Sequence, residues 1–231
     1  MFNLVAGEIA TDLNIPVTIV TSGKSILHGT GFTQHVIDKA TAQLTALGVT
    51  FEFDERLIFD SSFKDYSLEP LSLKGVSGKT YEADVVFKVT GNGVGNSSFM
   101  ESFITEAGVA KNEVLTEKGE IKVLPTGQLA TAPHIFSCGD VSDLDPQKTF
   151  VVVENQVNIV AANVTSLAAG FTKFKQYKKA SSVIGIVSLG RKGGVCQFGG
   201  ITLTGGRVAA MIKSADLFTK KYHGEVSAKI D

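Results

Sequence analysis

The chain has 231 residues, 43% of them hydrophobic and 19% charged, which is enough apolar content for one large domain or two small ones. Lysine and arginine total 22 against 23 acidic residues, so net charge gives no reason to expect binding to nucleic acid. The cysteines Cys138 and Cys196 form no CxxC pair, and the histidines show no ligand spacing, so we expect no dithiol centre and no metal. A reducing, cytoplasmic compartment fits this composition best.

The first quarter of the chain predicts alternating helices and strands. Residues 7–13 indicate the end of a helix, and the β-branched run at 17–21 indicates a buried parallel strand. Residues 32–47 carry one apolar helical face and are followed by Gly48, where a helix commonly ends. The alternating segment 49–53 then predicts a second strand.

The middle of the chain predicts hairpins and then another helix and strand. We expect a turn at Ser77-Gly78, a buried strand in ADVVFKVTG (83–91), a weak helix at 97–108 and a buried strand in HIFSC (134–138). This order of elements predicts an α/β fold.

The last third begins with an apolar stretch at 150–169 that predicts a largely buried helix. Short β-like runs separated by glycines follow at 182–213 and predict a small α+β C-terminal unit. The basic and apolar segment around Leu217 and Lys220 is a weak candidate for peripheral contact with a membrane surface.

The stretch ATAPHIFSCGD (130–140) is the most informative for function. An apolar strand that ends in Gly139-Asp140 places a carboxylate at the carboxyl edge of a sheet, where ligands bind in open α/β folds. Gly139 lets the backbone approach a ligand, and Asp140 can accept hydrogen bonds from the hydroxyls of a flavin ribityl chain. The alternative is an ordinary turn in which Asp140 caps a helix.

This stretch resembles the second flavin-binding motif of pyridine-nucleotide-dependent flavoprotein reductases, which has a threonine, an apolar strand and a terminal Gly-Asp. The resemblance continues through GDVSDLDPQKTFVVVENQVNIVAANV (139–164), SLGRKGGVCQFGG (188–200) and MIKSADLF (211–218). Together these segments look like the apoptosis-inducing-factor-like, ferroptosis-suppressor branch. The resemblance implies an FAD/NAD(P)-binding flavoprotein fold with two dinucleotide domains, here truncated at the N-terminus.

By the same resemblance, residues 1–90 are the remainder of an NAD(P)H-binding domain. Residues 91–172 are the C-terminal segment of an FAD-binding domain, and residues 173–231 are a small α+β region. The pair Thr90-Gly91 would lie where the chain crosses between the dinucleotide domains, with a strand-ending turn as its alternative.

The resemblance also implies roles for particular side chains. Gly139 and Asp140 would hold the ribityl and pyrophosphate region of FAD, and Lys148 and Thr149 would lie near the isoalloxazine ring. The alternative for Lys148 is an exposed charge in a loop. Gln156 is either a helix-surface residue or a group that faces the ring or a quinone.

The implied activity is that of an FAD-dependent NAD(P)H oxidoreductase with a quinone-like acceptor. Neither glycine fingerprint for a dinucleotide is present, and GNGVGN (91–96) has the wrong glycine spacing. The alternative is therefore a catalytically incomplete fragment or pseudoenzyme that acts as an interaction module, or a truncated gene model. Lys24 stands where an acid for the ribose hydroxyls is common, so the choice between NADH and NADPH stays open, as does the oligomeric state.

Overall fold

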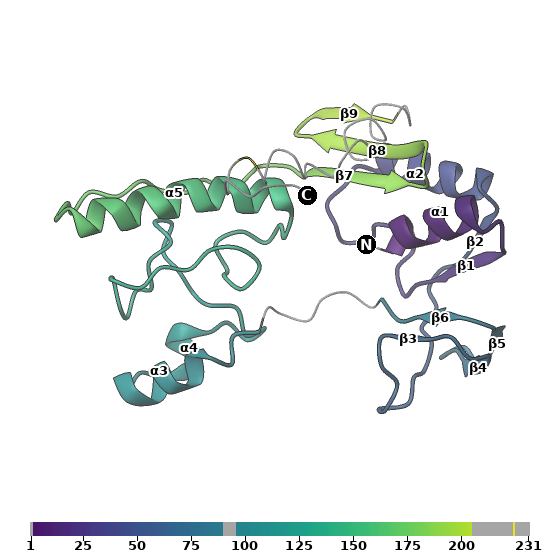
Figure 1. Cartoon of the computed structure of the whole chain (residues 1–231), viewed down its shortest axis with the longest axis horizontal. Helices are drawn as coiled ribbons and strands as arrows, with labels where there is room; N and C mark the ends of the chain where they lie inside the picture. The colour runs from purple at the N-terminus through teal and green to yellow at the C-terminus, as the bar shows by residue number, and fades with distance from the viewer. Residues whose placement is uncertain (1, 90–95, 205–223, 225–231) are drawn as a thin grey trace. The chain divides into compact units, whose positions relative to one another are not determined.

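The computed structural model of the chain describes residues 2–89, 96–204 and 224. The chain forms two compact units (Figure 1). The first consists of two segments, Met1–Gly91 and Gly185–Asp231, and the second is Asn92–Ile184. Each unit has hydrophobic core residues of its own. These units are defined by how the chain packs on itself and not by which cofactor each part binds. The predicted boundaries of the cofactor-binding domains, at residues 90 and 172, therefore stay a prediction.

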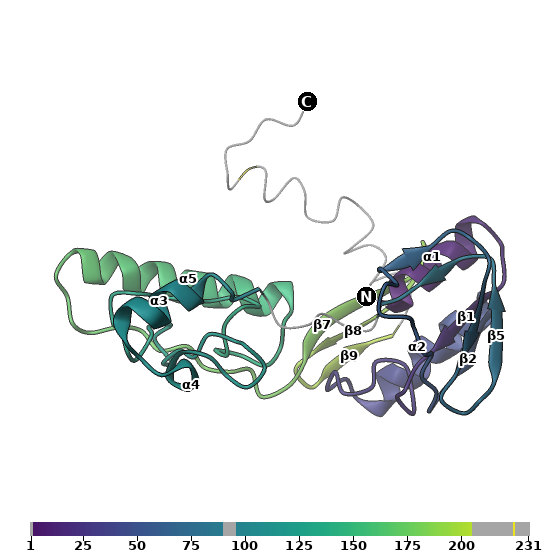
Figure 2. The same cartoon turned by 90° about the horizontal axis from the view of Figure 1, so that it is seen from below.

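The first unit begins with a parallel β-α-β passage. Its elements are α1 (Phe2–Asp12), β1 (Val17–Val20), α2 (Gln34–Ala46) and β2 (Val49–Glu52). Strands β1 and β2 pair in parallel, with Val17 opposite Val49, and they lie side by side in Figure 2. A parallel pair needs a crossover between its strands, and α2 is that crossover. Gly48 follows α2 with a φ of +85°, a conformation that glycine adopts without steric cost. The helix and the two strands predicted here are confirmed, but the predicted burial of the first strand is wrong, because Thr18 is exposed and the other residues of β1 are half-buried.

Apolar residues from α1, α2, β2 and the later strands form the core of this unit. The fully buried members of α2 recur at helical spacing, so one face of the helix lies on the core: Val36, Ala40 and Leu44. The sheet of β7 (Ile184–Leu189), β8 (Gly193–Phe198) and β9 (Ile201–Leu203) adds Leu189 and Val195 to it. The Gln43 side chain joins α2 to β8, because Gly194 N–H donates to its Oε1 at 2.7 Å.

The glycine-separated β runs predicted near the C-terminus are thus confirmed for residues 184–203. The stretch 211–218 and the basic segment near Leu217 lie outside the described residues. In the described segment, α1 approaches the turn after β7 so closely that a Cβ at Gly7 would lie 2.4 Å from Gly190 N.

Short antiparallel strands complete the first unit: β3 (Tyr66–Ser67), β4 (Leu71–Lys74), β5 (Thr80–Ala83) and β6 (Val86–Phe87). Strands β4 and β5 form the predicted hairpin, with Gly78 at a φ of +88° in its turn. The expectation of one buried strand from 83 to 91 is wrong for the described residues. Strand β6 is only two residues long, and Val85 and Phe87 are 43% and 45% exposed.

The second unit contains α3 (Met100–Ala107), α4 (Lys111–Val114) and α5 (Phe150–Ala168). Helices α3 and α5 confirm the helices predicted at 97–108 and 150–169. The expectation that the second is largely buried is wrong, because Phe150, Val157 and Val164 of α5 are exposed. The core of the second unit gathers Met100, Val114, Ile121 and Leu129, among others. The strand predicted at 134–138 is wrong: only a single bridge joins Phe136 to Gln128. Local hydrogen bonds, such as that from Ser137 N to Gly127 O at 2.8 Å, satisfy this backbone in place of a sheet.

Candidate functional site

The Gly139-Asp140 pair lies in a tight turn of the second unit. Gly139 has a φ of +82°, and its carbonyl accepts hydrogen bonds from both the backbone N–H and the hydroxyl of Ser142, each at 3.1 Å. The Asp140 side chain is exposed and makes no hydrogen bond or ion pair with any residue that the structure describes. A free carboxylate on a positive-φ glycine turn is suited to accepting hydrogen bonds from ligand hydroxyls.

Gly139-Asp140 forms a turn, as the alternative expects, but Asp140 does not cap a helix, so that part of the alternative is wrong. Helix α5 begins only at Phe150, and the residue before it is Thr149 in an extended conformation. For the same reason, the N-terminus of α5 does not directly follow Gly139-Asp140. The turn is held by contacts within its own loop and by one contact from α5.

That contact comes from Gln156, whose Oε1 accepts the Gly139 N–H at 2.7 Å. Gln156 is 1% exposed, so it is neither a helix-surface residue nor open to solvent. Two further buried polar residues, Asp145 and Tyr177, are paired with each other: the Tyr177 hydroxyl donates to Asp145 Oδ2 at 2.8 Å. Burial, first, and then Asp145 raise the pKa of Tyr177 to about 12.

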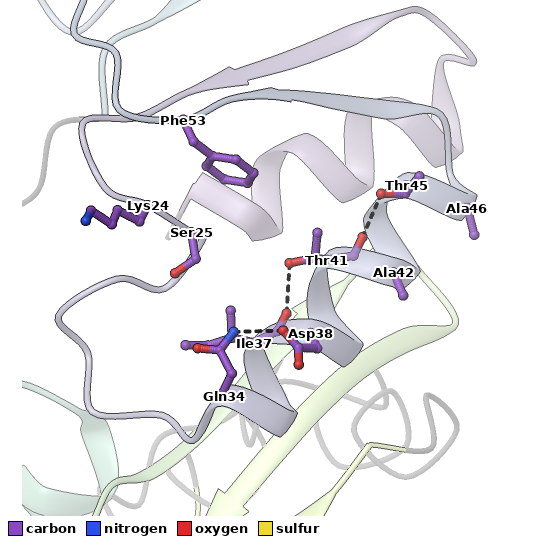
Figure 3. A pocket seen from close by; sticks show the side chains of 10 residues that line it. All are labelled: Lys24, Ser25, Gln34, Ile37, Asp38, Thr41, Ala42, Thr45, Ala46 and Phe53. Carbon is purple, nitrogen blue, oxygen red and sulfur yellow. Dashed lines mark hydrogen bonds between the residues drawn. The ribbon is translucent and has the colours of Figure 1, made fainter.

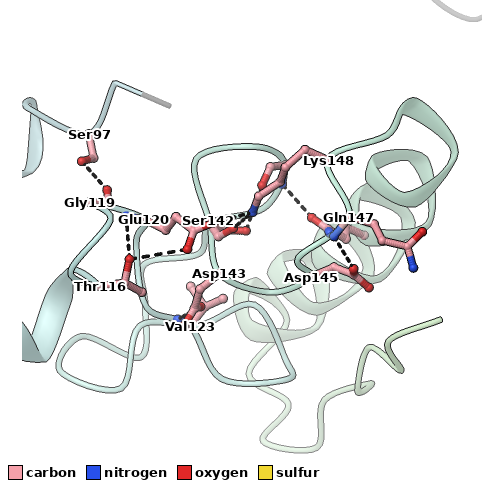
Figure 4. Close-up of polar contacts among 12 residues, drawn as sticks. Ser97, Thr116, Gly119, Glu120, Val123, Ser142, Asp143, Asp145, Gln147 and Lys148 are labelled. Atoms are coloured by element: carbon pink, nitrogen blue, oxygen red, sulfur yellow. Dashed lines mark hydrogen bonds and ion pairs between the residues drawn. The ribbon is translucent and has the colours of Figure 1, made fainter. Parts of the chain in front are cut away.

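Lys148 is tied to the same loop and is not a free loop charge, which corrects the alternative suggested by its sequence position. Its Nζ lies 3.0 Å from Glu120 Oε1 and also donates to the Ser142 carbonyl, as Figure 4 shows. Because Ser142 also bonds to Gly139, the structure brings Lys148 and the Gly139-Asp140 turn into one network. Thr149 Oγ1 donates to Ile184 O at 3.3 Å.

The remaining predicted site residues, Thr90 and Gly91, lie outside the described residues. Cys138 precedes the turn as a free, half-buried thiol, and burial raises its pKa. Within residues 2–89, 96–204 and 224, no group of three or more histidine, cysteine or acidic side chains is arranged to hold a metal. No described helix has the length and apolar content to cross a bilayer.

The first unit has an open groove of about 640 Å³ at the carboxyl ends of β1 and β2. Lys24 and Ser25 come from the loop after β1, and Phe53 directly follows β2. Figure 3 shows the Phe53 ring facing α2 across the groove, with Thr41 and Asp38 on the helix side. Asp38 accepts a hydrogen bond from Gln34 Nε2 at 2.8 Å. The groove therefore combines an aromatic wall with hydroxyls and both signs of charge.

Comparison with known proteins adds family relationships to this geometry. A family model described as pyridine nucleotide-disulphide oxidoreductase matches residues 4–180. The FAD-dependent oxidoreductase FVFD30 of Flammulina velutipes is 32% identical over 144 residues, which cover 61% of this chain and 42% of that protein. Apoptosis-inducing factor homolog B of Dictyostelium discoideum is 27% identical over 151 residues, 65% of this chain and 37% of that protein. The chain thus spans less than half the length of these relatives.

Solved structures show the same fold. The sulfide:quinone oxidoreductase from Aquifex aeolicus superposes with a TM-score of 0.63 at 15% identity, over 98% of this chain and 55% of that chain. The flavoprotein disulfide reductase RclA from Escherichia coli gives a TM-score of 0.58 at 15% identity, over 83% of this chain and 38% of that chain. The architecture is a partial α/β fold of the FAD/NAD(P)-binding flavoprotein type, as the sequence predicts.

Proposed function

Because the chain belongs to the pyridine nucleotide-disulphide oxidoreductase family, we propose that it takes part in FAD-dependent electron transfer from NAD(P)H to a quinone-like acceptor. The predicted likeness to apoptosis-inducing-factor proteins is confirmed by two Dictyostelium homologues of that name. Family membership supports flavin chemistry in general. The cofactor site, the reductant and the acceptor are parts of the proposal.

The observation that carries the proposal is the free Asp140 carboxylate on the Gly139 turn. Hydrogen bonds with the buried Gln156 and Ser142 side chains hold the Gly139 backbone, yet the exposed Asp140 carboxylate itself has no partner among the described residues. A ligand with several hydroxyls, such as the ribityl chain of FAD, would supply the missing donors. Gly139 carries no side chain that would obstruct an approaching ligand.

The chemistry that FAD supplies when bound is acceptance of a hydride from a reduced nicotinamide and return of the electrons to an acceptor. The chain's own residues would bind the flavin, orient its ring and adjust its electrostatic surroundings. Lys148 is paired with Glu120 and donates to the Ser142 carbonyl; a reduced flavin that replaced Glu120 as its partner would have its negative charge stabilised by the ammonium group. No side-chain nucleophile is needed.

The groove beside β1 and β2 is our candidate for the nucleotide part of NAD(P)H. The groove is open to solvent, and the carboxyl ends of parallel strands are where open α/β folds bind nucleotides. The Phe53 ring offers a face for an adenine base, and Lys24 and Ser25 offer donors to a ribose or its phosphate. The quinone-like acceptor is supported only by the name of the Aquifex enzyme that shares the fold.

Anaerobic spectroscopy tests the proposal step by step. The purified full chain should bind added FAD, bleach the flavin absorbance when NADH or NADPH is added, and recover it when a short-chain benzoquinone follows. Failure to bind FAD would favour the non-catalytic interaction module. Bleaching without recovery by the quinone would show that the acceptor class is wrong while leaving the reductase half intact.

A further inference from the structure

The middle strand of the C-terminal sheet carries a buried glutamine that reaches the start of α2. Gln197 of β8 is 2% exposed, and it follows two fully buried residues, Val195 and Cys196. A buried amide is costly unless it is hydrogen-bonded. The Gln197 Oε1 accepts the backbone N–H of Thr33 at 2.9 Å, and this bond joins residues that are 164 positions apart in the chain.

Strand β8 holds α2 at two points. Thr33 is the residue directly before α2, and its own side chain makes no capping hydrogen bond. The first N–H groups of a helix have no partner within the helix, and Gln197 supplies one for Thr33. Near the other end of α2, Gln43 accepts the Gly194 N–H at 2.7 Å and donates to the Gly194 carbonyl at 3.3 Å. The two attachments lie about 15 Å apart along the helix axis, so loss of one would let the helix tilt about the other.

Helix α2 presents a different face to the groove beside β1 and β2. The side chains of this face recur at spacings of three or four residues and form one wall of the groove, as Figure 3 shows: Gln34, Asp38, Thr41 and Thr45. Gln34 follows Thr33 directly, and its Nε2 donates to Asp38 Oδ1 at 2.8 Å. A displacement of Thr33 would therefore carry the Gln34–Asp38 pair with it.

The opposite side of the groove includes side chains of the loop that ends at Thr33. Lys24 and Ser25 belong to this loop, which follows β1. Its backbone is irregular, since Leu27 has a φ of +57° although it is not glycine. Ile26 is 3% exposed and anchors the middle of the loop on the apolar core. The bond from Gln197 holds the far end of the loop, where the loop side and the helix side of the groove meet.

We propose that Gln197 is a positioning residue for the nucleotide part of NAD(P)H. Gln197 does not line the groove, so it acts through the Thr33 N–H, by fixing the junction of loop and helix before the nucleotide arrives. A groove that is already held in its binding geometry loses less freedom when the ligand binds, which raises affinity. The inference rests on the proposed nucleotide groove for its functional consequence, whereas the Gln197–Thr33 bond is a property of the protein alone.

The Gln197→Met variant of the full chain, with FAD added, tests this role. Methionine keeps an unbranched side chain of similar length in the buried position and removes the acceptor. We expect the Thr33 amide to exchange faster with solvent, and the dissociation constants for NADH and NADPH to rise about five- to tenfold, as for the loss of one hydrogen bond. The FAD dissociation constant should stay within about twofold of the wild type, because Asp140 lies in the second unit. Hydrogen exchange and fluorescence titration measure these effects.

Two further variants separate positioning from packing. Gln197→Glu keeps an acceptor oxygen in either protonation state, so it should restore protection of the Thr33 amide and bring the NADH dissociation constant back to within about twofold of the wild type. Gln128→Met is the matched control, because Gln128 is also a buried glutamine, 6% exposed, whose side chain donates to Pro133 O at 2.6 Å in the second unit. Its substitution should lower the melting temperature and leave NADH affinity unchanged.

NADH and NADPH affinities in Gln197→Met within about twofold of the wild type would overturn the proposal, whatever the melting temperature of the variant. Restored Thr33 protection in Gln197→Glu without restored nucleotide affinity would overturn it as well. A wild-type chain that binds neither nucleotide would instead overturn the proposed groove. Hydrogen exchange needs no ligand, so unchanged Thr33 protection in Gln197→Met would refute the holding role of Gln197 in that case too.

Discussion

At the scale of single residues, Asp140 should affect ligand binding and hardly affect folding. Its carboxylate is exposed and has no partner among the described residues, so Asp140→Ala should change the free energy of unfolding of the cofactor-free protein by less than about 0.5 kcal/mol. Loss of a charge-assisted hydrogen bond, about 1.5–3 kcal/mol, should raise the FAD dissociation constant about ten- to a hundredfold. Fluorescence titration and urea unfolding of the same variant measure the two effects.

Asp145→Ala is the contrasting variant for that experiment. It would leave the Tyr177 hydroxyl and Gln147 N–H buried without an acceptor, at a cost of about 1–3 kcal/mol each. The free energy of unfolding should therefore fall clearly before any ligand is added. Equal FAD affinity in Asp140→Ala and wild type would refute the assignment of Asp140 to the flavin.

The sequence was sufficient to single out Gly139-Asp140, Lys148 and Gln156, but not the contacts by which Lys148 and Gln156 hold the loop, nor the pairing of Asp145 with Tyr177. The glycine-acid pair after an apolar run is a local pattern, whereas Tyr177 meets Asp145 across 32 residues of chain. A glutamine within the apolar stretch 150–169 was the available signal for Gln156. A single sequence does not show which turn a buried amide faces, because that depends on how the helix is rotated against the loop.

At the scale of elements, helices were predictable and isolated strands were not. The apolar period of α2 and α5 is imposed by one buried face and can be counted along the chain. The run at 134–138 is equally apolar, yet its backbone bonds within its own loop, so no second strand is needed to satisfy it. The segment 83–89 was expected to be one strand, but only Val86–Phe87 pairs as β6, because its partner β3 is itself two residues long.

Close approach of α1 to the β7–β8 turn makes Gly7 a sensitive position. A Cβ there would lie 2.4 Å from Gly190 N and 2.9 Å from the Leu189 carbonyl carbon, both rigid backbone atoms. Gly7→Ala should therefore displace α1 and cost about 1–3 kcal/mol of unfolding free energy, although alanine favours a helix. Gly200→Ala, where a Cβ meets nothing within 4 Å, is the control and should be nearly neutral. Urea unfolding with equal stability for both variants would contradict this packing.

The β4–β5 hairpin should owe part of its stability to the ionised form of Glu55. This buried carboxylate accepts hydrogen bonds from the Ser77 hydroxyl, from two backbone N–H groups and from Tyr81. The bond from Ser77, above all, lowers the pKa of Glu55 below its ordinary value of 4.5, against the opposing effect of burial. A lowered pKa gives stability that is present above pH 4.5 and is lost as the pH falls through the folded-state pKa.

The melting-temperature difference between wild type and Glu55→Gln should thus be largest near neutral pH and shrink below pH 4.5. The exposed Glu69→Gln is the control and should follow the wild type throughout. A difference that stays constant from pH 7 to pH 3 would show that Glu55 acts by shape and not by charge.

At the scale of the whole molecule, the separate cores predict more than one cooperative transition. Leu44 is fully buried in the first unit and Leu129 is 1% exposed in the second, and the two lie in different hydrophobic clusters. Truncation of either leucine to alanine should cost about 2–5 kcal/mol in its own unit. We expect Leu44→Ala to lower one calorimetric transition and Leu129→Ala to lower the other.

Ligands then connect those transitions to function. A ligand stabilises only the unit that binds it, by about 2.7 kcal/mol at a hundred times its dissociation constant. Since Asp140 belongs to the second unit, FAD should raise the transition that Leu129→Ala lowers. The groove of Lys24 and Phe53 belongs to the first unit, so NADH or NADPH should raise the transition that Leu44→Ala lowers. The two leucine variants assign each transition to a unit without any ligand. If FAD instead raised the transition of the first unit and NADH or NADPH that of the second, our assignment of the two nucleotides to these units would be wrong. A single transition that both ligands raise equally would show that the two cores unfold together.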